Sequence, residues 1–536
     1  PNFALQVIRV VSEDEKMIWL AQNIGKLDGT GLIYTGTRVD TETYAKWLQF
    51  IGVKAIDYHA GLDAETRKSI EGGLLQNKWK CVVSTNALGM GIDKPDIRFI
   101  IHTQIPASPI HYYQEIGRAG RDGKPTRIIL FYNESKDNGR EVPTDLVLPL
   151  SFIDGARPSI KKYQKVIELL KEEPLSEREI LKKANLKQTQ ARVIKSDLID
   201  QGIIKEVIYG KTKKYEYQYN APVLNTKYFE EQREAKLNEL RSMEQYIYTD
   251  MPRMKYLCKF LDSDEQMDYR NCDNTNLEKI HVVTSLELTK KLEDFRNTFF
   301  PILELASWTT KKYGFRVCIT SPYEILIEKT IKDHNNEVVK RYVNEYKNSI
   351  RESDYTHEEV EIIKEHLRKA SHMVNGYAAS YYGTSNVGAA IHRSKYENGG
   401  DFPDFLLKKT LSMFGKKFGD VKFDLVLYLP PTKSGDLVKN FAMKFASVIS
   451  VPISHALKKV RVTQEQKIFQ NSYSKRENVL GAFDIEDGIV KGKTILLIDD
   501  IYDSGATLKE VGNLLTRKGA TYIVPIVIAK TVGGTL

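Results

Sequence analysis

The chain has 536 residues, of which 41% are hydrophobic and 28% are charged. This length exceeds what one hydrophobic core supports and the composition excludes a disordered chain, so three or four globular domains are expected. Four cysteines without a C-x-x-C pair exclude a disulfide framework and predict a cytoplasmic protein. A formal charge of +9 favours a polyanionic partner, and neither a membrane span nor a signal peptide is predicted.

Residues 1–145 alternate short apolar runs with amphipathic stretches, which is typical of a parallel α/β domain. Glycines and polar turns separate the two kinds of segment. The runs expected as buried strands are Gly31–Tyr34, Cys81–Ser84, Phe99–His102 and Ile128–Phe131, and helices are expected over Thr41–Ile51 and Ile110–Ala119.

Four motifs follow one another through this domain. They read GLIYTGTR at 31–38, YHAGL at 58–62, STNALGMGIDKP at 84–95 and YQEIGRAGRDG at 113–123. Their order and spacing resemble the second-domain motifs of superfamily 2 helicases, and YHAGL and GMGIDKP resemble the RecQ family. The resemblance covers about the first 140 residues. It implies a RecA-like fold, ATP with Mg²⁺ as cofactor, and DNA as partner.

The last motif carries charge that suits phosphoryl transfer. Gln114, Arg118 and Arg121 are spaced i, i+4 and i+7, which predicts one shared helix face. Two guanidiniums there can reach across a domain cleft and neutralise a transferring γ-phosphoryl group. The resemblance implies finger-type roles for both arginines and a role for Asp93 in coupling ATP to DNA. Ion pairing of the arginines at the surface is the alternative.

DNA contacts in this domain are expected from Thr37, Arg38 and the turn at Ser84 and Thr85, where glycines at 89 and 91 let backbone amides approach phosphate. ATP hydrolysis also needs a Walker A loop and an acidic box in a preceding domain. The near matches at 488–494 and 14–15 lack the required spacing or strand context. We therefore expect a first motor domain before Pro1, without which this chain neither hydrolyses ATP nor unwinds DNA.

Residues 156–222 have the outline of a winged helix: three helices and then a hairpin. Ser176 and Glu179 form a capping box that begins the second helix. The third helix carries Gln188, Arg192 and Lys195 on one polar face, and the hairpin tip is basic. This pattern favours phosphate contacts that position a duplex, with a protein-contact module as the alternative. The expected DNA-binding residues are Arg192, Lys195, Lys211, Lys213 and Lys214.

Residues 223–280 are expected to form a helical subdomain, and 281–375 a connector of unclear fold. RecQ relatives carry four zinc-binding cysteines beyond the motor, and residues 270–274 resemble a remnant of that site. Only Cys258 and Cys272 lie in this region. Two thiols do not close a tetrahedral site, so zinc is doubtful and no metal ligand is assigned.

Residues 376–536 return to an α/β pattern, with strands expected at 425–429, 494–498 and 523–528. Residues 494–508 read TILLIDDIYDSGATL, a strand that ends in two carboxylates and a small-residue loop that opens a helix. This segment resembles the phosphoribosyl-pyrophosphate (PRPP) signature of type I phosphoribosyltransferases. Residues 461–483 resemble the ComF-like branch of that family, which is linked to bacterial DNA uptake.

The resemblance assigns ligand contacts in this tail. Asp499 and Asp500 would accept hydrogen bonds from the ribose hydroxyls, and Mg²⁺ would bridge ribose and pyrophosphate. Asp503 would either assist proton transfer at the base or cap the following helix. The 5′-phosphate is expected on Ser504, Gly505, Ala506 and Thr507 at a helix N-terminus, and the pyrophosphate beside Lys433.

The leading interpretation is the C-terminal portion of a bacterial RecQ-type DNA helicase, active in DNA repair or recombination, with a tail that binds PRPP or a nucleotide. Whether the tail is catalytic stays open. The alternatives are a nucleotide-salvage phosphoribosyltransferase with a nucleic-acid tether, and a non-catalytic DNA-binding scaffold.

Overall fold

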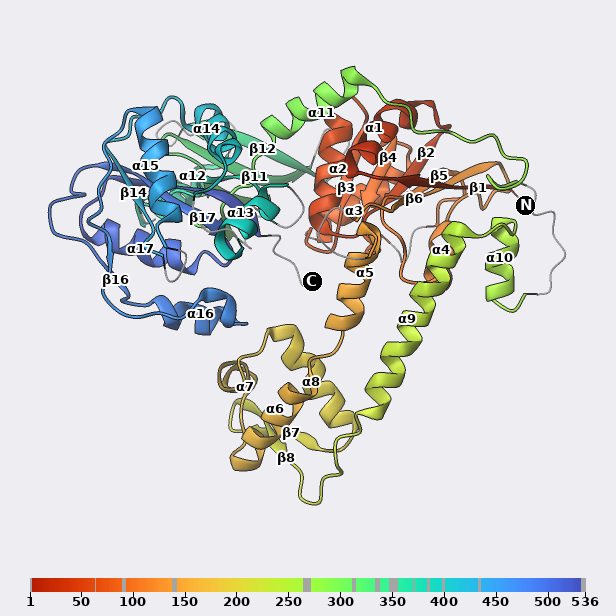
Figure 1. Cartoon of the computed structure of the whole chain (residues 1–536), viewed down its shortest axis with the longest axis horizontal. Coiled ribbons are helices and arrows are strands. Elements are labelled where there is room, and N and C mark those ends of the chain that lie inside the picture. Colours follow the sequence, from red (N-terminus) through yellow and green to blue (C-terminus); the bar gives the residue numbers. More distant parts are fainter. Residues whose placement is uncertain are drawn as a thin grey trace.

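The computed structural model has three lobes (Figure 1). An N-terminal lobe (residues 3–155) and a C-terminal lobe (residues 299–531) lie side by side, and a three-helix module (residues 159–222) forms a third lobe that contacts the C-terminal lobe through Asn185 and Asn471. Among the described residues, no helix combines the length and the apolar character needed to cross a membrane. The described residues are 2–62, 64–88, 93–136, 142–263, 271–310, 315–332, 338–346, 355–369, 372–382, 386–397, 401–431 and 435–531.

The N-terminal lobe is built on a parallel six-stranded sheet with the order β1-β6-β5-β2-β4-β3. Tyr34 of β2 is in register with Ser84 of β4 and His102 of β5, so these strands end at the same edge. The four strands expected from apolar runs correspond to β2, β4, β5 and β6. The elements are β1 Phe3–Val10, α1 Glu13–Asn23, β2 Thr30–Tyr34, α2 Arg38–Phe50, β3 Ala55–Tyr58, α3 Ala64–Leu75, β4 Cys81–Ser84, β5 Ile97–His102, α4 Pro109–Ile116, β6 Thr126–Asn133 and α5 Thr144–Gly155.

Helix α4 is shorter than the sequence predicted. It ends at Ile116, and the chain then turns back toward β6. Gly120 has φ +56°, and a Cβ there would approach neighbouring side chains to 2.4 Å, so this turn requires glycine. The prediction that Gln114, Arg118 and Arg121 share one helix face is therefore wrong. The two arginines lie in the turns after the helix.

The three-helix module has a small core that its three helices and its hairpin share. The capping box of Ser176 and Glu179 is confirmed. Helix α5 and the longer helix α9 connect the module to the N-terminal lobe (Figure 1). Arg233 of α9 binds Asp154 of α5, with Nη2 2.7 Å from Oδ1. The elements are α6 Ile160–Glu172, α7 Glu177–Lys183, α8 Gln188–Asp200, β7 Ile204–Tyr209, β8 Thr212–Tyr217 and α9 Lys227–Tyr248.

The segment after α9 folds back onto strand β1. Arg253, in helix α10 (Arg253–Phe260), and Asp273 form a buried ion pair with Nη2 3.1 Å from Oδ2. The same Asp273 oxygen accepts a hydrogen bond from the Val7 amide at 2.8 Å. Cys272 is buried beside β1, and helix α11 (Leu286–Thr298) then packs on α1 and α2 and reaches the C-terminal lobe.

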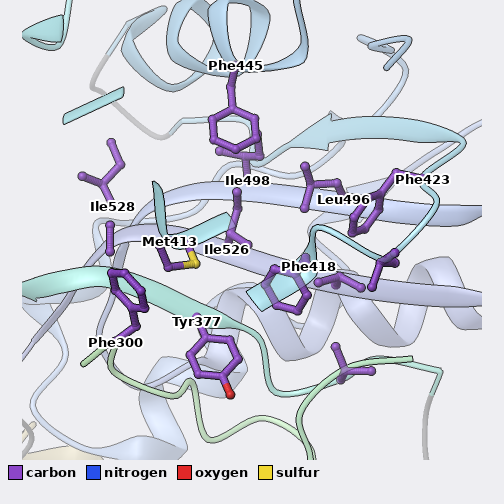
Figure 2. Packing of buried hydrophobic residues seen from close by; sticks show 14 of the residues in the cluster. Phe300, Tyr377, Met413, Phe418, Phe423, Phe445, Leu496, Ile498, Ile526 and Ile528 are labelled. Atoms are coloured by element: carbon purple, nitrogen blue, oxygen red, sulfur yellow. The ribbon is translucent and has the colours of Figure 1, made fainter. Parts of the chain in front are cut away.

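The C-terminal lobe joins two sheets around one core. An antiparallel sheet with the order β12-β11-β10-β9 lies within the segment whose fold the sequence left unclear. Its residues Val317 and Ile327 share a core with Ile498 and Ile526 of the parallel sheet. A domain boundary at residue 375, as expected from the sequence, would therefore cut through a single hydrophobic core. Figure 2 shows Phe418, Phe445 and other side chains of that core. The elements up to residue 369 are β9 Ser307–Thr310, β10 Phe315–Ile319, β11 Glu324–Lys332, β12 Val338–Tyr346 and α12 His357–Lys369.

The parallel sheet of this lobe has the order β13-β18-β17-β14. Strands β14, β17 and β18 correspond to the three that the sequence predicted. Helix α17 begins directly after the loop that follows β17, so the two expected ligand-binding segments are contiguous. The elements are β13 Tyr377–Tyr382, α13 Asn386–Tyr396, α14 Asp404–Phe418, β14 Leu425–Tyr428, α15 Leu437–Ile449, β15 Lys458–Lys459, α16 Ser472–Val479, β16 Phe483–Asp484, β17 Thr494–Tyr502, α17 Ala506–Arg517 and β18 Tyr522–Thr531.

Candidate functional site

The first candidate site lies at the carboxyl edge of the N-terminal sheet. The rings of Tyr34 and His102 stack with centroids 5.1 Å apart, and His102 Nε2 lies 2.8 Å from Glu115 Oε2. Burial and the negative charge of Glu115 raise the pKa of Tyr34, whereas the Arg118 guanidinium opposes the rise. Arg118 thus lies against a buried polar cluster. Tyr34, His102 and Glu115 were not predicted as site residues, although Tyr34 and Glu115 lie inside the motifs at 31–38 and 113–123.

Arg121 and Asp93, two predicted site residues, are brought together. Arg121 Nη1 lies 2.8 Å from Asp93 Oδ1, and their side chains are 43% and 82% exposed. An ion pair this open to solvent contributes little stability, so the guanidinium can exchange its carboxylate for a phosphate. Gln114 is exposed on α4, and the glycines at 89 and 91 lie outside the described residues.

The predicted DNA-binding residues of this lobe divide into exposed and internally bonded groups. Thr37 caps α2: its hydroxyl accepts from the Asp40 amide at 3.1 Å and donates to Asp40 Oδ2 at 2.6 Å. Burial raises the pKa of Asp40 to about 6, which the Thr37 hydrogen bond opposes. The Ser84 hydroxyl is buried and donates to the Thr85 carbonyl at 2.6 Å. Arg38 is exposed at the start of α2.

Lys195 does not lie on an exposed polar face, and that prediction is wrong. The residue is 7% exposed, and its ammonium lies 2.6 Å from Glu177 Oε2 and 2.9 Å from the Tyr215 hydroxyl. The physical reason is that α7 and the hairpin cover this part of α8, so the lysine needs partners inside the module. Arg192, one turn earlier, is exposed.

The hairpin lysines differ in whether their ammonium groups already contact partners within the module. Lys213 pairs with Glu206 at 2.5 Å, and Lys214 donates to the Pro174 carbonyl at 3.2 Å. Lys211 is exposed at the tip. Arg192 and Lys211 are therefore the predicted residues of this module best placed to meet a polyanion.

The second candidate site lies at the carboxyl end of β17. Lys395 of α13 pairs with Asp500, with Nζ 2.6 Å from Oδ2, and both side chains are largely buried. Burial and the adjacent Asp500 raise the pKa of Asp499 to about 8. Burial alone would lower the pKa of Lys395, but Asp500 outweighs it, so that pKa is raised. Lys395 was not predicted as a site residue because it lies in a helix far from the motif in sequence.

The loop between β17 and α17 suits a phosphate. Gly505 is the N-cap of α17 with φ +71°, and the Ser504 hydroxyl accepts from the Ala506 amide at 3.4 Å. Free amides at a helix N-terminus attract anions, and Thr507 adds a hydroxyl in the first turn. These residues fit the 5′-phosphate of PRPP, and the two aspartates fit its ribose hydroxyls. Lys433 lies outside the described residues.

Asp503 does not cap α17, so that alternative is wrong. Gly505 holds the N-cap position, and the Asp503 carboxylate forms an ion pair with Lys475 of α16. It also accepts from the Thr531 hydroxyl at 3.2 Å. The carboxylate thus joins α16 and β18 to the start of the phosphate loop.

Two known protein families match the segments of the chain that carry these two sites. Residues 15–123 match the helicase conserved C-terminal domain, and residues 439–533 match the phosphoribosyl transferase domain. The "Probable ATP-dependent DNA helicase RecS" of Bacillus subtilis is 34% identical over 199 residues, 36% of this chain and 38% of that protein. The ATP-dependent DNA helicase RecQ of Synechocystis is 35% identical over 164 residues, 30% of this chain and 31% of that protein.

Solved structures also resemble part of the chain. A DEAD box protein from Methanococcus jannaschii is 30% identical, with a TM-score of 0.23, and the match covers 24% of this chain and 36% of that one. The chain spans well under half the length of the curated relatives it matches. The expected α/β multidomain class is confirmed, and one polypeptide carries a RecQ-like helicase C-terminal domain and a phosphoribosyl transferase domain.

Proposed function

We propose that this chain is the C-terminal portion of an ATP-dependent RecQ-type DNA helicase that also binds PRPP. The supporting observation is that Arg118 and Arg121 lie together after α4, with Arg121 held by a solvent-exposed pair to Asp93 and by a hydrogen bond to the Gly117 carbonyl at 3.3 Å. Both arginines would complete an ATP site whose phosphate-binding loop and Mg²⁺ belong to a first motor domain. Asp93 would couple that site to DNA.

The three-helix module acts as a winged helix that positions DNA. Arg192 and Lys211 supply contacts to backbone phosphates, and Arg38, Thr37 and the turn at Ser84 and Thr85 hold the strand that crosses the N-terminal lobe. Exposed positive charge on the module supports this role. The cellular setting that suits these activities is DNA repair or recombination in the cytoplasm.

The C-terminal lobe binds Mg²⁺ and PRPP. Asp499 and Asp500 accept hydrogen bonds from the ribose, while Ser504 and Thr507, with the amides between them, hold the 5′-phosphate. The buried carboxylate pair next to an open helix N-terminus supports this assignment. Transfer of the ribosyl phosphate to a free base is a second candidate activity, which Asp503 supports by its position at the start of the loop.

The helicase function is tested on the longer protein that includes a first motor domain. DNA-stimulated ATP hydrolysis and strand separation are expected from the longer protein, and neither is expected from residues 1–536 alone. Arg118→Ala should abolish both activities. An active longer protein that tolerates this substitution would contradict the proposed role of Arg118.

A further inference from the structure

Helix α16 and the loop before it join the C-terminal lobe to the three-helix module. The Asn471 side chain donates to the Leu181 carbonyl at 3.0 Å. The Asn185 side chain donates to the Ile468 carbonyl at 2.9 Å and accepts from the Gln470 amide at 3.0 Å. These contacts satisfy carbonyls at the end of α7 and in the loop, so the two lobes complete each other's hydrogen bonding.

Charged contacts reinforce the same interface. Lys182 of α7 pairs with Glu477 of α16, and the Arg178 guanidinium lies 5.0 Å from the centre of the Tyr473 ring. In Figure 1, α16 lies on the side of the C-terminal lobe that faces the module. Helix α7 is therefore docked on α16 through several independent contacts.

The opposite side of α16 reaches the phosphate loop. Lys475 pairs with Asp503 and is only 15% exposed. Arg461 donates to the carbonyls of Asn478 at 2.8 Å and Leu480 at 2.9 Å, which fixes the end of α16. One helix of eight residues thus contacts the module on one side and the loop at 503–507 on the other.

We propose that the three-helix module contributes to PRPP binding, because it holds α16 in the position where the Lys475 ammonium can offset negative charge at the phosphate loop. A phosphate on residues 504–507 would stand next to the Asp503 carboxylate. The ammonium of Lys475 offsets that repulsion only while α16 stays in place. Lys475 is then a phosphate-binding residue, and Asn185 and Lys182 are positioning residues. This inference rests on the proposed binding of PRPP.

Linkage makes the coupling reciprocal. If docking of the module strengthens PRPP binding, PRPP must strengthen docking by the same factor. The docking of the module, which contacts DNA, and the binding of PRPP to the C-terminal lobe would then be coupled through α16.

The test separates the module from α16 without unfolding either lobe. Asn185 has φ +50°, so Asn185→Gly keeps its backbone conformation and removes two hydrogen bonds, while Lys182→Glu faces Glu477 with like charge. Asn220→Gly is the matched control, because Asn220 has φ +60° and is exposed in the module outside this interface. Energy transfer between dyes on α6 and α15 reports docking, and calorimetry with Mg²⁺ and PRPP reports binding.

The double variant should lose energy transfer and bind PRPP about tenfold more weakly, which corresponds to about 1.4 kcal/mol. The control should match the wild type, and PRPP should increase energy transfer in the wild type. Adding Glu477→Lys, which restores opposite charges, should recover part of both signals.

Separated lobes with wild-type affinity for PRPP would overturn the inference, and so would lobes that stay docked in the double variant. A different result marks failure of the proposed function itself. In that case wild type and variants alike show no heat with PRPP, although the dyes still report separation in the double variant.

Discussion

Lys395 Nζ lies 2.6 Å from Asp500 Oδ2, and this pair places a positive charge beside the two carboxylates at the end of β17. Helix α13 and strand β17 are far apart in sequence, so the pair ties the edge of the lobe to its candidate ligand site. Burial would lower the pKa of the Lys395 ammonium, but the two neighbouring carboxylates outweigh it and raise that pKa, so Lys395 stays charged in a largely buried position.

Removing the Lys395 charge should therefore destabilise the C-terminal lobe. Lys395→Met leaves Asp500 buried without its cation, and the free energy of opening at β17 should fall by about 3 kcal/mol. Lys395→Arg should stay near the wild type. Hydrogen exchange of the β17 amides measures this free energy. Equal protection in Lys395→Met and wild type would show that the ion pair does not stabilise β17.

Asp499 should make the lobe less stable as pH rises. Its folded pKa of about 8 exceeds the ordinary value of 3.8, so the folded state binds the proton more tightly than the unfolded chain does. The stability that this carboxyl contributes is complete below pH 3.8 and is lost as pH rises toward 8. Asp499→Asn should remove this slope and raise the free energy of unfolding at pH 8. Urea unfolding at pH 5 and pH 8 measures the difference, and an unchanged slope would argue against a protonated Asp499.

Arg121 should matter for ATP hydrolysis and not for folding. In the longer protein, Arg121→Ala should reduce DNA-stimulated ATP hydrolysis by about 1,000-fold, as expected for a finger-type arginine. The melting temperature should hardly change, because the pair with Asp93 is open to solvent. Arg9→Ala is the control, since Arg9 forms a similarly exposed pair with Glu134. Normal hydrolysis in Arg121→Ala would leave the surface ion pair as the role of this arginine.

The basic residues of the module should separate into two classes. Arg192→Ala and Lys211→Ala should each weaken duplex binding and reduce the salt dependence by about one counterion, with no loss of stability. Lys195→Met should instead cost about 2 kcal/mol of stability, because Glu177 loses its partner. Duplex titrations at several salt concentrations, beside urea unfolding, distinguish the classes. A lower salt slope in Lys195→Met would mean that Lys195 reaches DNA after all.

Much of the parallel architecture could be predicted because buried parallel strands are continuous apolar runs. Residues 81–84 and 494–498 stand out in this way. Strand β12 could not be recognised in this way, because its sequence VVKRYVNEY mixes charged and apolar residues. Its role as a sheet strand follows from pairing with β11, which no local pattern reveals.

Site residues were predictable where a local motif carried them and not where the fold supplied the partner. Asp499 and Asp500 lie in a motif, whereas Lys395 comes from another helix. Helical spacing placed Lys195 on a polar face, but periodicity cannot show that Glu177 and the hairpin cover it.

Calorimetric titration with Mg²⁺ and PRPP tests the account most directly. The wild-type chain should bind one equivalent, and the variant with Asp499→Asn and Asp500→Asn should lose binding while its fold persists. Saturable binding to the wild type alone would establish the C-terminal lobe as a PRPP site. The absence of heat from the wild type at millimolar PRPP would contradict that assignment.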